Sequence, residues 1–308
     1  MENSPDSVAF LKLVWYNWHI IHAQSVHTEG EIHMKVGHTP KIFGAWGEDR
    51  YRKMKEIGYD YADFDLPGEL NGCTEEEYEA AVLHEKALAD EAGVTIWQTH
   101  GPWRWPPHDE TEEARQERAE VMRRSLRLTG LIGVKYWVIH PIMPYGDYQD
   151  PEPEVFWQMN LDFFRALLPV AKEYGITICF ENMPMLALAI STPEATLRFI
   201  RDMDDEHFKF CLDTGHCAVF GLSCGDAVRM AGGDLKVLHV HDNNGLGDQH
   251  LPPYRGVVDW AAFGAALREI HFDGVFSLEA GYPAGLPIDE LEAQLIAARR
   301  SIDALTAD

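Results

Sequence analysis

The chain alternates short apolar runs with longer segments whose apolar residues recur at helical spacing. Short runs rich in β-branched and aromatic residues are typical of strands buried on both faces, as in a parallel sheet. Six of these runs end on a residue that can bind a metal or transfer a proton: TIWQTH at His100, KYWVIH at His140, ITICFE at Glu181, FKFCLD at Asp213, KVLHVH at His241 and VFSLE at Glu279. The pattern therefore predicts a parallel sheet with reactive side chains along one edge.

From residue 34 onward, eight predicted strands alternate with eight predicted helices. The strands span residues 34–37, 59–66, 94–100, 134–140, 176–181, 208–213, 235–241 and 275–279. Helical stretches with acidic starts span residues 48–57, 75–92, 112–131, 153–174, 193–203, 224–231, 260–270 and 289–305. Several of them end at a glycine just before the next strand, as in EIGYD and EAGVT, where a left-handed residue stops the helix.

Eight strand–helix units in a chain of 308 residues predict an α/β fold of the (β/α)8 TIM barrel type. In such a barrel the active site lies at the C-terminal ends of the strands, where the charged residues fall. The alternative, a doubly wound open sheet, is disfavoured because no GxGxxG motif follows an early strand. We expect one barrel domain over residues 34–308, preceded by an N-terminal arm or extra helix over residues 1–33.

Charge and cysteine content narrow the choice of partners. Fifty acidic and 26 basic residues give a formal net charge of −24, which repels phosphate backbones and anionic membrane surfaces. The apolar stretch near the N-terminus is too short to span a bilayer. Five cysteines without a CxxC spacing indicate reduced thiols. We therefore expect a cytoplasmic protein that binds neither nucleic acid nor membrane, while the sequence leaves open whether the chain forms a homo-oligomer.

Four of the charged strand ends form a candidate metal site. Glu181, Asp213, His241 and Glu279 end four successive strands, so in a barrel they lie side by side around one arc of the mouth. Three carboxylates and one imidazole suit a divalent Mn, Co, Mg or Zn ion. Strand alternation puts His239 on the same side as His241 but deeper, so we predict His241 as the ligand and His239 as a packed or supporting imidazole.

Further polar residues flank this set. His216 follows Asp213 by three residues in CLDTGHC, a spacing that lets both side chains face one pocket if the strand gives way to a helical turn. Asp248 and His250, in the loop GLGDQHLPPYRG, are two further candidate ligands. Arg255 in the same loop is a candidate for binding a hydroxyl, carboxylate or phosphate group.

Taken together, the motifs ENMP, CLDTGHC, HVHDNN with DQHLPP, and SLE resemble those of the xylose isomerase-like barrel superfamily, which includes sugar isomerases, ketose 3-epimerases and endonuclease IV. The resemblance runs from about residue 34 to the C-terminus. By resemblance to the epimerases, one metal is held by Glu181, Asp213, His241 and Glu279. The two glutamates would also transfer the proton, and His216 would touch the substrate.

The leading hypothesis from this resemblance is a divalent-metal-dependent isomerase or epimerase that acts on a sugar through an enediolate. Aromatic residues near the predicted mouth suit stacking on a sugar ring: Trp103, Trp105, Tyr145 and Trp157. A C-glycoside or 3-oxo-glycoside cleaving enzyme of the same superfamily, often with a partner subunit, is one alternative. A sugar-binding sensor without activity is another, although the intact set of ligands argues against it.

A third alternative follows from the resemblance to endonuclease IV, a phosphodiesterase with three zinc ions. Its additional ligands would correspond to His100, His140, His216, Asp248 and His250, all of which are present. Two or three zinc ions would then be bound instead of one divalent ion. The net charge of −24 and the lack of an Arg/Lys-rich loop argue against DNA as its substrate.

Overall fold

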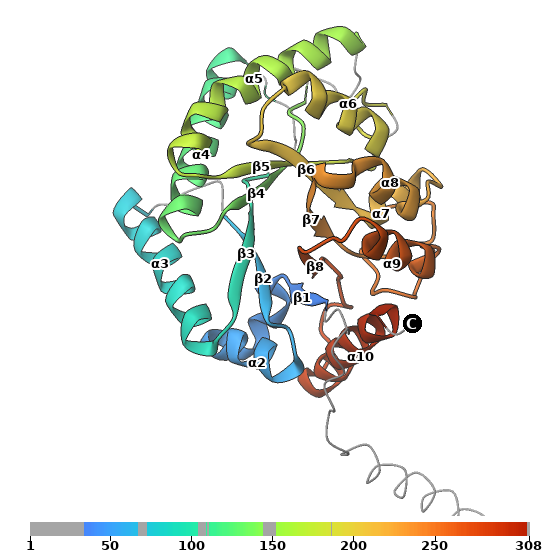
Figure 1. Ribbon diagram of the computed structural model, residues 1–308. Helices are drawn as coiled ribbons and strands as arrows, with labels where there is room; N and C mark the ends of the chain where they lie inside the picture. The colour runs from blue at the N-terminus through green and yellow to red at the C-terminus, as the bar shows by residue number, and fades with distance from the viewer. Residues whose placement is uncertain are drawn as a thin grey trace, which may run out of the picture. The chain divides into compact units, whose positions relative to one another are not determined.

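Eight parallel strands form a barrel in the computed structural model, which describes residues 34–66, 73–103, 109, 111–143, 152–185 and 187–306 (Figure 1). The strands are β1 (Lys35–His38), β2 (Tyr61–Asp65), β3 (Thr95–His100), β4 (Tyr136–Ile139), β5 (Thr177–Glu181), β6 (Phe208–Asp213), β7 (Leu235–His239) and β8 (Val275–Leu278). Their spatial order follows the chain from β1 to β7, with β8 beside β1. The predicted arm over residues 1–33 lies outside the described residues.

The ring closes between β7 and β8 through a single parallel bridge that pairs Val240 with Leu278. Two hydrogen bonds hold it: the Val240 amide donates to the carbonyl of Ser277 at 2.8 Å, and the Glu279 amide donates to the carbonyl of Val240 at 3.0 Å. The other neighbouring strands pair over two or more residues each. The predicted (β/α)8 barrel is therefore confirmed, with its weakest junction beside two of the predicted ligands.

Helices surround the barrel in the described residues. They are η1 (Pro40–Asp49), α2 (Arg50–Ile57), α3 (Glu75–Ala92), α4 (Glu112–Leu131), α5 (Pro153–Glu173), α6 (Pro193–Met203), α7 (Thr214–Val219), α8 (Cys224–Ala231), η2 (Gly232–Asp234), α9 (Trp260–Glu269) and α10 (Ile288–Thr306). The predicted helices end within two residues of the observed ones. Most of η1, all of α7 and the short η2 are additions to the predicted pattern.

Local sequence explains where the helices start and stop. At the start of α3, Thr74 accepts a hydrogen bond from the Glu77 amide at 3.2 Å while its own amide donates to the Glu77 carboxylate at 2.8 Å. This reciprocal cap satisfies two amides that the helix leaves unpaired. Gly58 and Gly93 follow α2 and α3 with φ of 101° and 70°, which are left-handed values that stop a helix and turn the chain into the next strand.

Strand alternation decides which side chains point into the barrel. The barrel interior holds a small apolar cluster, separate from the larger core between strands and helices, made of Val138, Cys179, Cys211 and Val237. Because alternate residues of a strand point to the same side, the residue two positions further along each of these strands also points inward. Those residues are His140, Glu181, Asp213 and His239. The fold thus places a polar layer directly above the apolar interior cluster.

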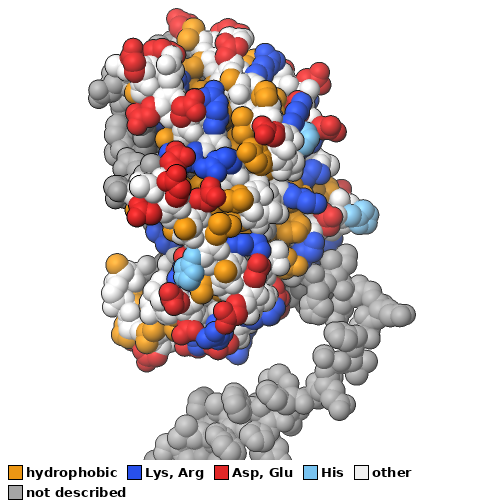
Figure 2. All heavy atoms as spheres, turned by 90° about the vertical axis from the view of Figure 1, so that its left-hand side faces the viewer, with side chains coloured by type: hydrophobic (Ala, Val, Ile, Leu, Met, Phe, Trp, Pro, Cys, Tyr) orange, Lys and Arg blue, Asp and Glu red, His pale blue; other side chains and the backbone are white. Residues whose placement is uncertain are grey.

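The outer surface shows no large area of one charge sign on the side that Figure 2 presents, which is the side covered by α3 and α4. Acidic and basic side chains alternate there, and some pair between the helices, as in the 2.6 Å ion pair of Arg127 with Glu79. Among the described residues, no helix combines the length and apolar character that crossing a membrane requires.

Candidate metal centre and active site

Three of the predicted carboxylate ligands meet at the C-terminal mouth of the barrel. Glu181 and Asp213 end β5 and β6 and are almost fully buried, while Glu279 follows β8. One ligand atom from each lies within 4.8 Å of the others, and the imidazole that completes this group of four is that of His239. We call these four residues the central group.

His239 is held between two sets of carboxylates. Its Nε2 donates to Asp63 Oδ2 at 2.8 Å, and its Nδ1 lies 3.0 Å from Glu181 Oε1 and 3.4 Å from Glu279 Oε2. Gln98 donates from Nε2 to the same Asp63 oxygen at 2.8 Å, so the carboxylate is itself fixed. Nδ1 of His239 is therefore the nitrogen presented to the central group.

His241, the imidazole predicted as ligand, lies outside the central group but next to it. Its Nε2 is 3.0 Å from Asp213 Oδ2, and its ring stacks on that of His250 with centroids 4.0 Å apart. Its place is tightly defined, since a Cβ on Gly215 would approach the His241 ring to 1.9 Å. Strand register explains the difference in depth, because Asp213 of β6 pairs with His239 of β7.

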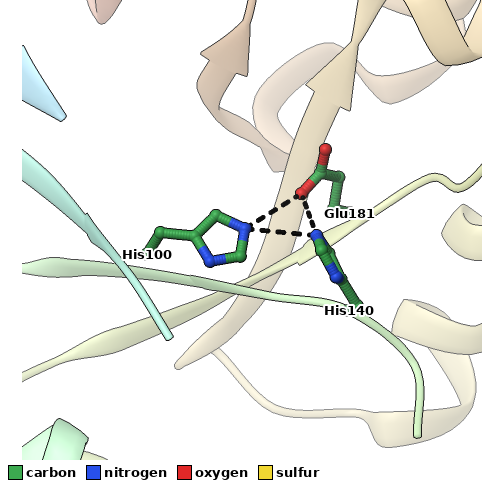
Figure 3. A group of neighbouring side chains, drawn as sticks. All are labelled: His100, His140 and Glu181. Carbon is green, nitrogen blue, oxygen red and sulfur yellow. Dashed lines mark hydrogen bonds and ion pairs between the residues drawn. The ribbon is translucent and has the colours of Figure 1, made fainter. Parts of the chain in front are cut away.

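A second group shares Glu181 with the first (Figure 3). His140 Nε2 lies 3.1 Å from Glu181 Oε2 and 3.1 Å from His100 Nε2, while His100 Nε2 lies 3.7 Å from the same carboxylate oxygen. Figure 3 shows the three ligand atoms facing one another. Glu181 therefore offers one oxygen to the central group and the other to the pair of histidines.

A third group forms where α7 meets the loop before α9. Asp248 Oδ2 lies 3.3 Å from His216 Nε2 and 3.2 Å from His250 Nε2. The turn of helix needed to bring His216 beside Asp213 is α7, and Asp213 caps it by accepting a hydrogen bond from the His216 amide at 2.6 Å. The Asp213 carboxylate thus belongs to the central group and also positions His216 of the third group.

Backbone carbonyls fix which nitrogen three of these histidines present. A carbonyl oxygen only accepts, so the Nδ1 atoms of His100, His216 and His250 carry the hydrogens that they donate to Gly101, Asn182 and Glu279 at 2.7, 2.6 and 2.8 Å. Their Nε2 atoms are left to face the carboxylates. Histidines that bind metals commonly donate their other ring nitrogen to a carbonyl or carboxylate in this way.

The buried charges shift one another's pKa values. Burial alone would raise the pKa of Glu181, but the surrounding imidazoles, His239 first, hold it well below its usual range. Burial alone would also raise the pKa of Asp213, which His216 and His241 lower. Glu279 differs, because its partly enclosed position and the nearby Glu181 and Asp213 carboxylates raise its pKa.

The pKa values of three imidazoles shift upward in response to the carboxylates. Burial would lower the pKa of His100, but the neighbouring Glu181 carboxylate raises it to about 9. Burial would also lower the pKa values of His216 and His250. Asp213 and Asp248 instead raise the pKa of His216 to about 10, and Asp248 raises that of His250 to about 9. For His140 burial prevails and the pKa falls. The carboxylates of Glu181 and Asp213 are thus compensated by protons on neighbouring rings.

These residues fit a divalent metal ion. Buried carboxylates are costly unless a cation compensates them, and Glu181 Oε2 makes no acceptable hydrogen bond within the described residues although it is buried. Oxygen and imidazole donors together suit Mn, Co, Mg or Zn. The residues that would hold one ion are those of the central group, and the second group would offer a further site.

A pocket of about 210 Å³ opens beside the central group. It is lined by Asp63, His100, His250 and Glu279 together with the segments that follow β1 and β8. About one third of the Glu279 side chain is exposed, against 1% for Glu181, so Glu279 is the glutamate that a bound molecule meets first. Asp63 and Gln98 were missed by sequence reasoning, although their polar side chains inside apolar strands signal a buried role.

Two of the predicted substrate-binding residues, Trp103 and Arg255, lie further out than His216. Trp103 is 47% exposed and its ring lies 6.4 Å from that of His140, at the edge of the mouth. Arg255 is exposed in the loop before α9, and neither residue belongs to the described lining of the pocket. Trp157 is buried in the helix layer against Phe199, which corrects its predicted place at the mouth. Trp105 and Tyr145 lie outside the described residues.

A family profile described as "Xylose isomerase-like TIM barrel" matches residues 51–305. The chain belongs to this family. Among its relatives, D-psicose 3-epimerase of Ruminiclostridium cellulolyticum is 28% identical over 201 residues, which is 63% of this chain and 66% of the relative. The match thus spans less than two thirds of that relative's own length.

Solved structures of other proteins share the fold. A D-tagatose 3-epimerase-like protein superposes with a TM-score of 0.72 at 22% identity, covering 88% of this chain and 97% of the other. The 3-keto-D-glucoside 4-epimerase of E. coli gives a TM-score of 0.70 at 22% identity, covering 87% and 99%. At this identity the likeness establishes the barrel architecture.

Proposed function

We propose that the protein is a divalent-metal-dependent sugar isomerase or epimerase. The observation that carries the proposal is the central group, in which three carboxylates and the His239 imidazole converge beside a pocket of about 210 Å³. The family's sugar epimerases support the choice of substrate class.

The proposed proton transfer uses Glu279 and Glu181. When bound, a divalent ion polarises a carbonyl and an adjacent hydroxyl of the sugar, which acidifies the carbon-bound proton between them. Glu279 lines the pocket and is placed to exchange that proton with the substrate. Glu181 is its proposed partner, connected to the pocket through His100, whose Nε2 lies 3.7 Å from Glu181 Oε2. Return of the proton to the opposite face gives epimerisation, and return to the neighbouring carbon gives aldose–ketose exchange.

The remaining predicted residues have supporting roles in this proposal. His216 presents Nε2 toward Asp248 at the rim of the central group, where it would contact the substrate or a further ion. Trp103 at the edge of the mouth would stack on the sugar, and Arg255 would approach it from the loop before α9. His239 is our preferred imidazole ligand, because its Nδ1 faces two of the three carboxylates within 3.4 Å.

The experiment combines metal analysis with solvent-deuterium exchange followed by NMR on a panel of ketoses with added Mn. We expect exchange by the wild type, loss of exchange in Glu279→Gln, and loss of bound metal in His239→Asn. His241→Asn is the matched comparison and should lose less metal. Full deuterium exchange in Glu279→Gln would mean that another group moves the proton. Loss of metal only in His241→Asn would mean that His241, and not His239, is the imidazole ligand.

A second candidate is a phosphodiesterase with two or three zinc ions. The observation that favours it is the presence of further ligand groups beside the central one, with His100 and His140 on Glu181, and His216 and His241 on Asp213. Two or three zinc ions per chain, together with cleavage of a phosphodiester at catalytic enzyme levels, would favour this candidate over the isomerase. One ion per chain and sugar exchange would exclude it. A 3-oxo-glycoside cleaving activity is tested by adding such glycosides to the same panel and following release of the leaving group.

A further inference from the structure

A cavity of about 660 Å³ adjoins the pocket beside the central group. Three residues belong to the lining of both, namely Thr39, Lys41 and Asp65, which follow β1 or end β2. The larger space lies between η1 and the first turns of α3 at the C-terminal ends of β1 and β2. It therefore adjoins the pocket where the proposed chemistry takes place.

The lining of this cavity is suited to an apolar group. Its walls consist mainly of hydrocarbon and aromatic surface from Pro40, Gly44, Phe64, Tyr78, Ala81 and Val82. Two charged residues of the lining compensate each other, because Arg50 forms an ion pair with Glu85, and Tyr51 donates a hydrogen bond to that carboxylate at 3.1 Å. The other two charged residues of the lining, Lys41 and Asp65, also belong to the smaller pocket, so apart from the Arg50–Glu85 pair the walls of this cavity alone are mainly apolar.

We propose that the substrate is a sugar derivative that carries an apolar substituent, with the sugar beside the central group and the substituent in this adjoining cavity. The inference rests on the proposed function and specifies its substrate class. The smaller pocket, at about 210 Å³, suits a single sugar ring, while the adjoining cavity is three times larger and apolar. An aryl or alkyl glycoside with an oxidised ring carbon combines both parts, because its carbonyl acidifies a neighbouring proton.

The structure offers two variants that fill the cavity from opposite walls. A Cβ on Gly44 meets no atom within 4 Å, and Gly44 has no left-handed backbone, so Gly44→Leu adds a side chain without a clash. Ala81 is exposed on α3, which makes Ala81→Phe a second variant. The matched controls are Gly233→Leu, which has equally open surroundings in η2, and Ala80→Phe, which is exposed on α3 outside the lining.

The test compares a methyl and a phenyl 3-oxo-glucoside by solvent-deuterium exchange, with a free ketose as the third substrate. Burial of the phenyl ring predicts a kcat/KM at least about tenfold above that of the methyl compound. Gly44→Leu and Ala81→Phe should bring this ratio close to one, and both controls should keep it. Exchange of both glucosides at equal rates would overturn the inference while leaving the proposed function intact.

A binding measurement separates the inference from the chemistry. Phenyl and methyl glucosides without the oxo group do not exchange protons, so calorimetry with the metal-loaded protein reports on the cavity alone. We expect at least about tenfold tighter binding of the phenyl compound, lost in Gly44→Leu and kept in Gly233→Leu. If no sugar exchanges deuterium, the proposed function fails. Equal binding of the two glucosides would then overturn the cavity assignment as well.

Discussion

At the scale of single residues, the central group depends on the orientation of one imidazole. Asp63 accepts from Nε2 of His239 and thereby turns Nδ1 toward Glu181 and Glu279. A carboxylate partner of this kind also makes the ring a stronger donor to a metal. Asp63 is buried at the bottom of the pocket and is fixed by Gln98, so its effect is transmitted with little motion.

Asp63→Asn is therefore expected to weaken metal binding by about 10- to 100-fold while leaving the barrel folded, because Asn keeps the size of Asp but loses its charge. Titration with Co²⁺, followed by its visible absorbance, measures this without any substrate. Asp60→Asn, on the exposed approach to β2, is the control and should bind as the wild type does. Unchanged Co²⁺ affinity in Asp63→Asn would show that His239 needs no carboxylate behind it.

Most of the side chains that converge at the mouth were predictable from the sequence, because reactive residues at the ends of apolar strands are visible without a structure. The sequence did not show which of His239 and His241 joins the three carboxylates of the central group. Alternation puts both rings on one side of β7, but their depth depends on the register between β6 and β7, where Asp213 pairs with His239. Register is a property of two strands, so the local sequence of one strand does not contain it.

At the scale of elements, the loop between β7 and α9 is held by one buried carboxylate. Asp242 accepts four hydrogen bonds between 2.9 and 3.1 Å, from the amides of Asn243, Gly256 and Val258 and from the indole of Trp260. This loop carries Asp248 and His250. A single side chain therefore anchors both ends of the segment that supplies the third ligand group.

Asp242→Asn is expected to lower the free energy of unfolding by about 1–3 kcal/mol, because its amide group faces donors that would lose their acceptor. Chemical denaturation measures this loss. Asp273→Asn, at an exposed position before β8, is the matched control and should change stability little. If Asp242→Asn proves as stable as the control, the loop is held by contacts other than this carboxylate.

Most elements were predictable because their limits are marked locally, by Thr caps and by glycines such as Gly58 and Gly93. Short α7 was suggested only as a condition for bringing His216 beside Asp213. Asp213 both ends β6 and caps the start of α7. The six residues of α7 are too few to show a helical pattern that would reveal this double role. The ten-residue η1 contains a non-helical Gly47, which disrupts the periodicity that would have identified it.

At the scale of the whole molecule, the buried cluster ties stability to pH when metal is absent. His100, His216 and His250 have pKa values of about 9, 10 and 9 when folded, above the value of about 6.5 for an unfolded histidine. Groups with raised pKa values stabilise the fold fully below about pH 6.5, and this contribution is lost as pH rises through the folded values. The lowered pKa values of Glu181 and Asp213 act at the acidic end, where stability is lost as pH falls.

The chelator-treated protein is therefore expected to show its highest Tm near pH 5–6 and a falling Tm between about pH 7 and 10. With metal bound, the ion replaces the protons as the compensating charge, so the alkaline decline should become smaller. Thermal unfolding over this pH series, with and without metal, measures both curves. A flat Tm for the chelated protein from pH 6 to 10 would contradict the assigned coupling of carboxylates and imidazoles.

The narrow junction between β7 and β8 also bears on the motions of the protein. Only the bridge at Val240 and Leu278 joins these strands among the described residues, and it lies between His239 and Glu279. An ion bound by both residues would link β7 to β8. Its removal should therefore allow local opening of the barrel between these two strands first. Hydrogen–deuterium exchange at the Val240 and Glu279 amides should then be fast in the chelated protein and slowed by metal, whereas amides between β5 and β6 should respond far less. Equal protection of the amides at the β7–β8 junction and between β5 and β6 in the chelated protein would mean that the junction is stable without the ion.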